Sequence, residues 1–89
     1  MSKYIINNDE YIVRKINEQY VFLKFANGDS HLLDDVGTIF LDFYLNNNNP
    51  IDKLIEYFSD VDFETVKKDF SDFLNQLIDK RMLIKGENN

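Results

Sequence analysis

The sequence contains no cysteine and a single histidine, His31. Without cysteine there can be no disulfide framework, thiolate zinc site, iron–sulfur cluster or thiol nucleophile. One histidine cannot supply a multi-histidine metal site or a triad with cysteine, and a lone strand histidine is most often structural or exposed. The three glycines are isolated, so no loop resembles a phosphate-binding loop. We therefore expect no catalytic residue, no metal and no cofactor.

Long apolar runs and positive charge are also scarce. The sequence has no signal peptide and no apolar run near 18 residues, which predicts a soluble, cytoplasmic protein without a membrane partner. Ten lysine and arginine residues stand against 16 aspartate and glutamate residues, giving a formal net charge of −6. A phosphate backbone would be repelled by this charge, so nucleic acid is not an expected partner.

What the sequence does have is enough apolar material for one small core. Of its 89 residues, 44% are hydrophobic and 15% are aromatic, and phenylalanine is the commonest aromatic. A chain of this length forms one domain of modest stability, so we expect a single domain over residues 1–89.

The first third of the chain predicts antiparallel strands. Segments Tyr11–Ile16 and 20–25 are rich in β-branched and aromatic residues, and Asn17 with Glu18 between them can form a tight turn. A third strand is expected at residues 30–33, which would complete a meander.

The Asn-Gly pair at 27–28 is the strongest hairpin signal, because both residues tolerate positive φ. A two-residue turn at this pair would place Leu23 opposite Leu32 and make Leu32 the inward residue. A longer turn would instead place His31 and Leu33 inside. The sequence leaves both registers open.

The remainder predicts three helices. Asp34 or Asp35 can cap the first, Asn49 followed by Pro50 begins the second, and Asp62 can cap the third. Apolar residues recur behind these caps at helical spacing. They are Val36, Ile39, Phe40, Phe43 and Tyr44; then Ile51, Leu54, Ile55 and Phe58; then Phe63, Val66, Phe70, Phe73, Leu74, Leu77 and Ile78.

Two further segments complete the predicted order. Lys80 and Arg81 are expected in the last turn of the third helix, where cations favour the helix dipole. Residues 4–6 and 82–84 can form short strands. The predicted fold is α+β, a three-stranded antiparallel β-meander followed by three helices, similar to a winged helix-turn-helix.

Two other functions are open to a chain of this kind. Ser30 follows Asp29 much as the serine of acyl and peptidyl carrier proteins does, which would make it a phosphopantetheine site. However, His31 separates Ser30 from Leu32, and the residues before it alternate as strands do where a carrier protein needs a long helix. A DNA-binding winged helix is the second alternative, but the cations of the third helix are offset by its carboxylates.

Three motifs follow one another from Leu33 onward. Residues 33–40 read Leu-Asp-Asp-Val-Gly-Thr-Ile-Phe, residues 50–55 read Pro-Ile-Asp-Lys-Leu-Ile, and residues 81–84 read Arg-Met-Leu-Ile. In this order, over about residues 11–85, the chain resembles the PqqD-like family of RiPP recognition elements. Three positions depart from the family pattern, since Asp34 replaces an asparagine, Arg81 a glycine and Ser30 a common aromatic residue.

The resemblance implies that the chain binds the leader of a ribosomally made precursor peptide as an added β-strand. The third strand would offer an unpaired edge, and the third helix would supply apolar side chains beside it. The side of that helix carrying Val66, Asp69, Phe73 and Gln76 is favoured over the opposite side. The expected peptide-binding residues are Ser30, His31, Leu32, Leu33, Val66, Asp69, Phe70 and Phe73.

The family also implies a second partner. Its members present the bound leader to a modifying enzyme or a leader protease, such as a radical SAM maturase, a cyclodehydratase or a lasso-peptide protease. The sequence does not distinguish among these partners or identify the precursor.

Overall fold

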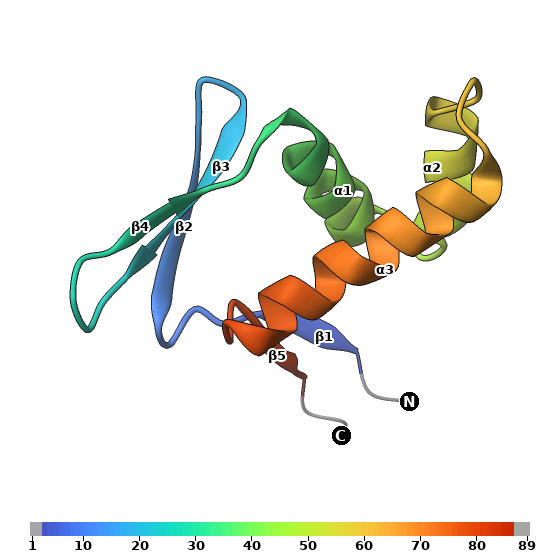
Figure 1. Ribbon diagram of the computed structural model, residues 1–89. Coiled ribbons are helices and arrows are strands. Elements are labelled where there is room, and N and C mark those ends of the chain that lie inside the picture. The colour runs from blue at the N-terminus through green and yellow to red at the C-terminus, as the bar shows by residue number, and fades with distance from the viewer. Residues whose placement is uncertain (1–2, 87–89) are drawn as a thin grey trace.

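The computed structural model describes residues 3–86 as five strands and three helices (Figure 1). In chain order these are β1 (Tyr4–Ile6), β2 (Tyr11–Ile16), β3 (Gln19–Lys24), β4 (Ser30–Leu32), α1 (Asp35–Asn46), α2 (Pro50–Tyr57), α3 (Phe63–Asp79) and β5 (Leu83–Lys85). The predicted α+β fold, with a meander before three helices, is confirmed.

Strands β2, β3 and β4 form an antiparallel sheet in that order. Asn17 and Glu18 join β2 to β3 with φ values of 51° and 63°. Positive φ at both central residues is the geometry of a two-residue hairpin turn whose twist matches the strands. The predicted tight turn is therefore present.

The connection to β4 is longer than two residues. The Lys24 amide donates to the Asp29 carbonyl at 2.8 Å, and Leu23 pairs with Ser30 while Val21 pairs with Leu32. The register that placed Leu23 opposite Leu32 is therefore wrong.

The face that β4 turns to the core is set by β3. Phe22 is fully buried and pairs with His31, and Leu33 beyond them is also buried, whereas Leu32 is 59% exposed. In the predicted two-residue register Leu32 lies opposite Leu23, and in the observed register it lies opposite Val21. Both partners are on the same face of β3. The outward position of Leu32 thus follows because β3 turns Tyr20 and Phe22 inward.

Two of the three helices begin with the predicted side-chain caps. The carboxylate of Asp34 accepts a hydrogen bond from the backbone N–H three residues later at 2.7 Å, and that of Asp62 does so at 3.3 Å. Asn49 precedes Pro50 as predicted, but its amide donates to the Asp52 carboxylate at 2.9 Å and makes no backbone cap. Proline at the first position needs no N–H partner.

The end of α3 differs from the prediction, because Lys80 is the cap residue and Arg81 lies beyond the helix with φ of 60°. The Arg81 amide donates to Ile78 O at 3.0 Å and the Met82 amide to Leu77 O at 2.9 Å. These two bonds define a Schellman motif, whose left-handed position usually holds glycine.

Strands β1 and β5 pair antiparallel and bring the two ends of the described chain together beside the end of α3 (Figure 1). Both short strands were predicted, although β5 begins at Leu83 rather than at residue 82. Buried Asn7 joins these strands to the end of α3. Its backbone N–H donates to Met82 O at 2.9 Å, and its side-chain Nδ2 donates to Arg81 O at 2.8 Å.

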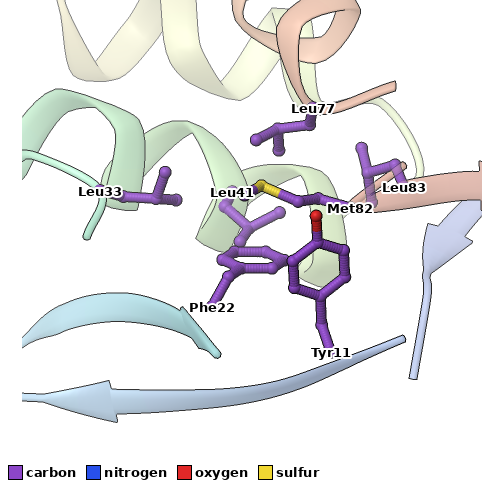
Figure 2. Close-up of a cluster of buried hydrophobic side chains, with 7 residues drawn as sticks. All are labelled: Tyr11, Phe22, Leu33, Leu41, Leu77, Met82 and Leu83. Carbon is purple, nitrogen blue, oxygen red and sulfur yellow. The ribbon is translucent and has the colours of Figure 1, made fainter. Parts of the chain in front are cut away.

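The core consists of two clusters with shared neighbours. Figure 2 shows the first, in which Tyr11 and Phe22 project from the sheet toward Leu41 of α1 and Leu77 of α3. The second joins the three helices through Phe40, Leu54, Val66 and Phe70. Helix α1 thus contributes to both clusters.

The predicted helical stripes need three corrections. Leu41, which was not predicted to face inward, is fully buried because α1 packs against the sheet as well as against the other helices. Val36 and Phe63, both predicted on apolar faces, are 47% and 51% exposed. Each lies near the start of its helix, at a position that does not face the core.

Candidate functional site

The outer edge of β4 has no strand beside it among the described residues. Antiparallel neighbours alternate between pairs that exchange hydrogen bonds and pairs that do not. The bond from Lys24 to Asp29 and the bond from Leu33 to Tyr20 O at 2.9 Å fix this alternation. The N–H and C=O groups of Ser30 and Leu32 therefore point away from β3, toward the free edge.

A groove runs between this edge and α3. Its middle section, about 210 Å³, lies between residues 31–33 and the C-terminal half of α3. A section of about 340 Å³ continues it past the start of α1, and a wider section of about 780 Å³ continues it toward the loop before β4. Adjacent sections share lining residues, namely Asp34, Gly37, Phe73 and Gln76 on one side and His31 and Lys80 on the other.

Gly37 allows close packing between α1 and α3 beside the groove. A Cβ atom at this position would lie 3.0 Å from Asp34 Oδ1 and 3.2 Å from a Phe73 ring carbon. Both contacts are tighter than ordinary van der Waals packing, so glycine allows the first turn of α1 to approach α3 closely. This is a physical reason for the glycine in the motif at residues 33–40.

The predicted strand residues take three different positions. Leu33 is buried, His31 is partly buried in the groove, and Ser30 and Leu32 are exposed at the edge. Burial lowers the pKa of His31, and the nearby Lys80 ammonium lowers it further to a smaller extent. The imidazole is therefore largely neutral at pH 7 and brings no charge to the middle of the groove.

The predicted α3 residues divide between groove and core. Asp69 and Phe73 line the groove on the favoured side of the helix. Val66 and Phe70 are only 3% and 4% exposed, and both belong to the helical core cluster. Neither residue is among those that line the groove.

Several lining residues, Gln76 and Lys80 of α3 among them, were left out of the predicted contact set. Gln76 and Lys80 line the middle section with Phe73. Together with Asp69 they form a stripe at spacings of four, three and four residues, and the four positions span about 60° around the helix. This spacing is legible in the sequence once Phe73 is assigned to the groove.

The structure differs from what a carrier protein or a DNA-binding winged helix would require. Ser30 lies in an edge strand after a β-hairpin, where a carrier protein would need a long helix before it. On α3, Lys68 lies 2.9 Å from the Asp72 carboxylate and Lys67 lies 4.0 Å from that of Glu64. These cations are therefore paired within the helix.

Within residues 3–86, no three histidine, aspartate or glutamate side chains are grouped as metal ligands would be. None of the helices in this range is long and apolar enough to cross a membrane.

No family model and no curated protein matches the sequence. The structure, however, is similar to that of TbiB1 in complex with the TbiA(beta) leader peptide, with a TM-score of 0.74 and 26% sequence identity. The similarity covers 96% of this chain and the whole of that chain. The predicted resemblance to leader-binding domains is thereby confirmed.

Proposed function

We propose that this chain is a peptide-binding adaptor that holds the leader of a ribosomally synthesised precursor as an added strand on β4. The observation that carries the proposal is the free β4 edge, which borders a groove in a fold similar to that of a leader-peptide complex.

An added strand would satisfy the exposed backbone of β4. Ser30 and Leu32 each offer one N–H and one C=O, so a peptide in register can form up to four backbone hydrogen bonds with them. These bonds are independent of the peptide's sequence. They can supply affinity, but they cannot by themselves select one leader.

Selection would come from the groove. Alternate side chains of a bound strand point to opposite faces, so every second residue of the leader would face α3. There it would meet the Phe73 ring and the backbone at Gly37 in the middle section of the groove. Two or three such residues would give the site its sequence preference.

The adaptor role rests on what the groove contains. His31 is its single imidazole, and burial keeps that group from titrating as an ordinary surface histidine does. We assign no catalytic step and no cofactor to the chain. The bound leader would instead be presented to a modifying enzyme or leader protease, in the cytoplasm where precursors are made.

Isothermal titration with the leader and the core of a candidate precursor from the same genome, as separate peptides, tests the proposal. The leader should bind with a micromolar Kd or better, which is about −8 kcal/mol, and the core peptide should not. A scrambled leader of the same composition is the control for nonspecific binding. Tight binding of the core peptide alone would refute the proposal.

An NMR titration with the same leader locates the site. Amide shifts should centre on residues 30–33 and on α3 around Phe73. Shifts confined to α1 and the loop at residues 46–49 would place the site elsewhere and exclude strand addition on β4.

A further inference from the structure

The two ends of the groove differ in charge. The section beside the start of α1 is lined by the carboxylates of Asp34, Asp69 and Asp72 and by no cation. The opposite section is lined by three cations, Lys24, Lys80 and Arg81, and by two carboxylates, Asp29 and Asp79. The groove therefore changes along its length from an end whose charged residues are all acidic to an end lined by charges of both signs.

Some of these charges are already paired. Arg81 Nη2 lies 2.9 Å from Glu10 and Asp72 lies 2.9 Å from Lys68, while Asp34 caps α1. Within residues 3–86, Asp69 and Lys80 have no oppositely charged group within 4.0 Å. Both side chains are exposed, so they are available to a ligand.

Asp69 and Lys80 lie on the same stripe of α3. Eleven residues at 1.5 Å separate them by about 16.5 Å along the helix axis, whereas positions i and i+4 of an extended chain are about 13 Å apart, and the remaining distance of about 3 Å is within the reach of long charged side chains. Residues i and i+4 of a strand point to the same face. A bound strand can therefore place one side chain near each charge.

The direction of the bound strand follows from the sheet. Every pair in the meander is antiparallel, and an antiparallel addition continues this pattern with the slightly more stable geometry. The groove sections show that the chain from residue 28 to residue 37 runs against the direction of α3. A strand antiparallel to β4 would thus run along α3 from Asp69 toward Lys80.

We propose that the groove selects leaders by the order of their charges, with a basic side chain at position i against Asp69 and an acidic one at position i+4 against Lys80. This inference rests on the proposed function. It adds that a leader with the same two charges exchanged is rejected, because each would then meet a like charge.

The test uses the full chain and a phage-displayed library of random 12-residue peptides. Peptides selected on the wild type should be enriched in lysine or arginine four positions before aspartate or glutamate. Selection on the double variant Asp69→Lys, Lys80→Glu should enrich the opposite order. A synthetic pair of selected and charge-exchanged peptides should differ in affinity on the order of tenfold at low salt, and less at high salt.

A matched control keeps the net charge and moves the exchange elsewhere. Lys53 and Glu56 are exposed on α2, away from the groove, and the double variant Lys53→Glu, Glu56→Lys should select peptides as the wild type does. Thermal denaturation of both double variants checks that they remain folded.

The outcomes separate this inference from the proposed function. Selected peptides that lose binding to Leu32→Pro but show no charge order would overturn the inference alone. The same holds if the order persists on the Asp69→Lys, Lys80→Glu variant. A library that yields no peptide sensitive to Leu32→Pro would overturn both.

Discussion

Replacing Leu32 by proline tests strand addition at a single atom. The N–H of Leu32 points to the free edge of β4, so proline removes a donor that a bound peptide would use without removing a bond to β3. The Leu32 side chain is 59% exposed and its loss leaves the core intact. The variant should therefore fold normally but bind the leader weakly.

The expected loss can be estimated from one backbone hydrogen bond. Losing it and leaving a peptide carbonyl unsatisfied costs about 1–3 kcal/mol. At about 1.4 kcal/mol per tenfold change, the leader's Kd should rise roughly 5- to 150-fold. Isothermal titration measures this rise, and circular dichroism with thermal denaturation establishes that the variant is folded.

Leu32→Ala is the matched control, because it shortens the same side chain and keeps the N–H. His31→Pro is the opposite control, since His31 pairs with Phe22 through the ladder and its loss should destabilise the sheet itself. If Leu32→Pro and Leu32→Ala bind the leader equally well, the peptide does not pair with β4 and the reasoning fails.

Three further predictions address other parts of the molecule. Phe73→Ala should weaken leader binding by on the order of 1–3 kcal/mol in a titration, whereas a loss of roughly 3–5 kcal/mol of stability with unchanged binding would make Phe73 a core residue only. Incubation with a phosphopantetheinyl transferase and coenzyme A should leave the mass unchanged, and attachment at Ser30 would revive the carrier-protein alternative. Burial and the hydrogen bond to Asp42 raise the pKa of Tyr20 to about 12. The neutral phenol is thus favoured in the folded state, so denaturant titrations should show wild-type stability falling more steeply than that of Tyr20→Phe between about pH 10 and 12. Equal slopes would contradict this assignment.

The parts of the fold that depend on local chemistry were predictable. Asn17 and Glu18 form their turn, and Asp34 and Asp62 cap their helices, because each of these features depends on residues within a few positions. Hydrophobic periodicity likewise gave the helices. Their number, order and approximate bounds follow from the sequence alone.

The side of β4 that points to the core was not predictable in the same way. β3 carries apolar residues on both faces, with Tyr20 and Phe22 on one and Val21 and Leu23 on the other. Alternation can assign faces only when one row is polar. The arrangement is decided by packing, because Phe22 is the β3 residue that is fully buried, against α1 and α3. That choice in turn determines which β4 residues face the groove.

The division of α3 between groove and core has a similar cause. Val66 and Phe70 pack against α1 and α2, and Phe40 of α1 lies between the Phe70 and Phe73 rings with both centroids 5.5 Å away. Helix α2 covers the N-terminal half of α3, and β4 with the start of α1 lies beside the C-terminal half. A periodic stripe records which residues are apolar, but not where along the helix one neighbour gives way to another.

Arg81 shows how a local rule can be broken at the site with little loss of stability. A left-handed conformation costs a residue with a side chain roughly 1–2 kcal/mol, which glycine avoids. Glycine, however, loses more backbone entropy on folding, by roughly 0.5–1 kcal/mol relative to alanine. The Arg81 side chain also pairs with Glu10 at 2.9 and 3.0 Å, and an exposed pair of this kind adds little to stability.

These contributions nearly cancel, so backbone preference alone does not require glycine at position 81. The bond from Asn7 to the Arg81 carbonyl would form with either residue, because it uses only the backbone of position 81. What arginine adds is a guanidinium, paired with Glu10, at the end of the groove that Lys80 and Lys24 also line. Departures from local preference tend to lie at functional sites, and Arg81, which departs from the family pattern, lies at the end of the proposed leader-binding groove.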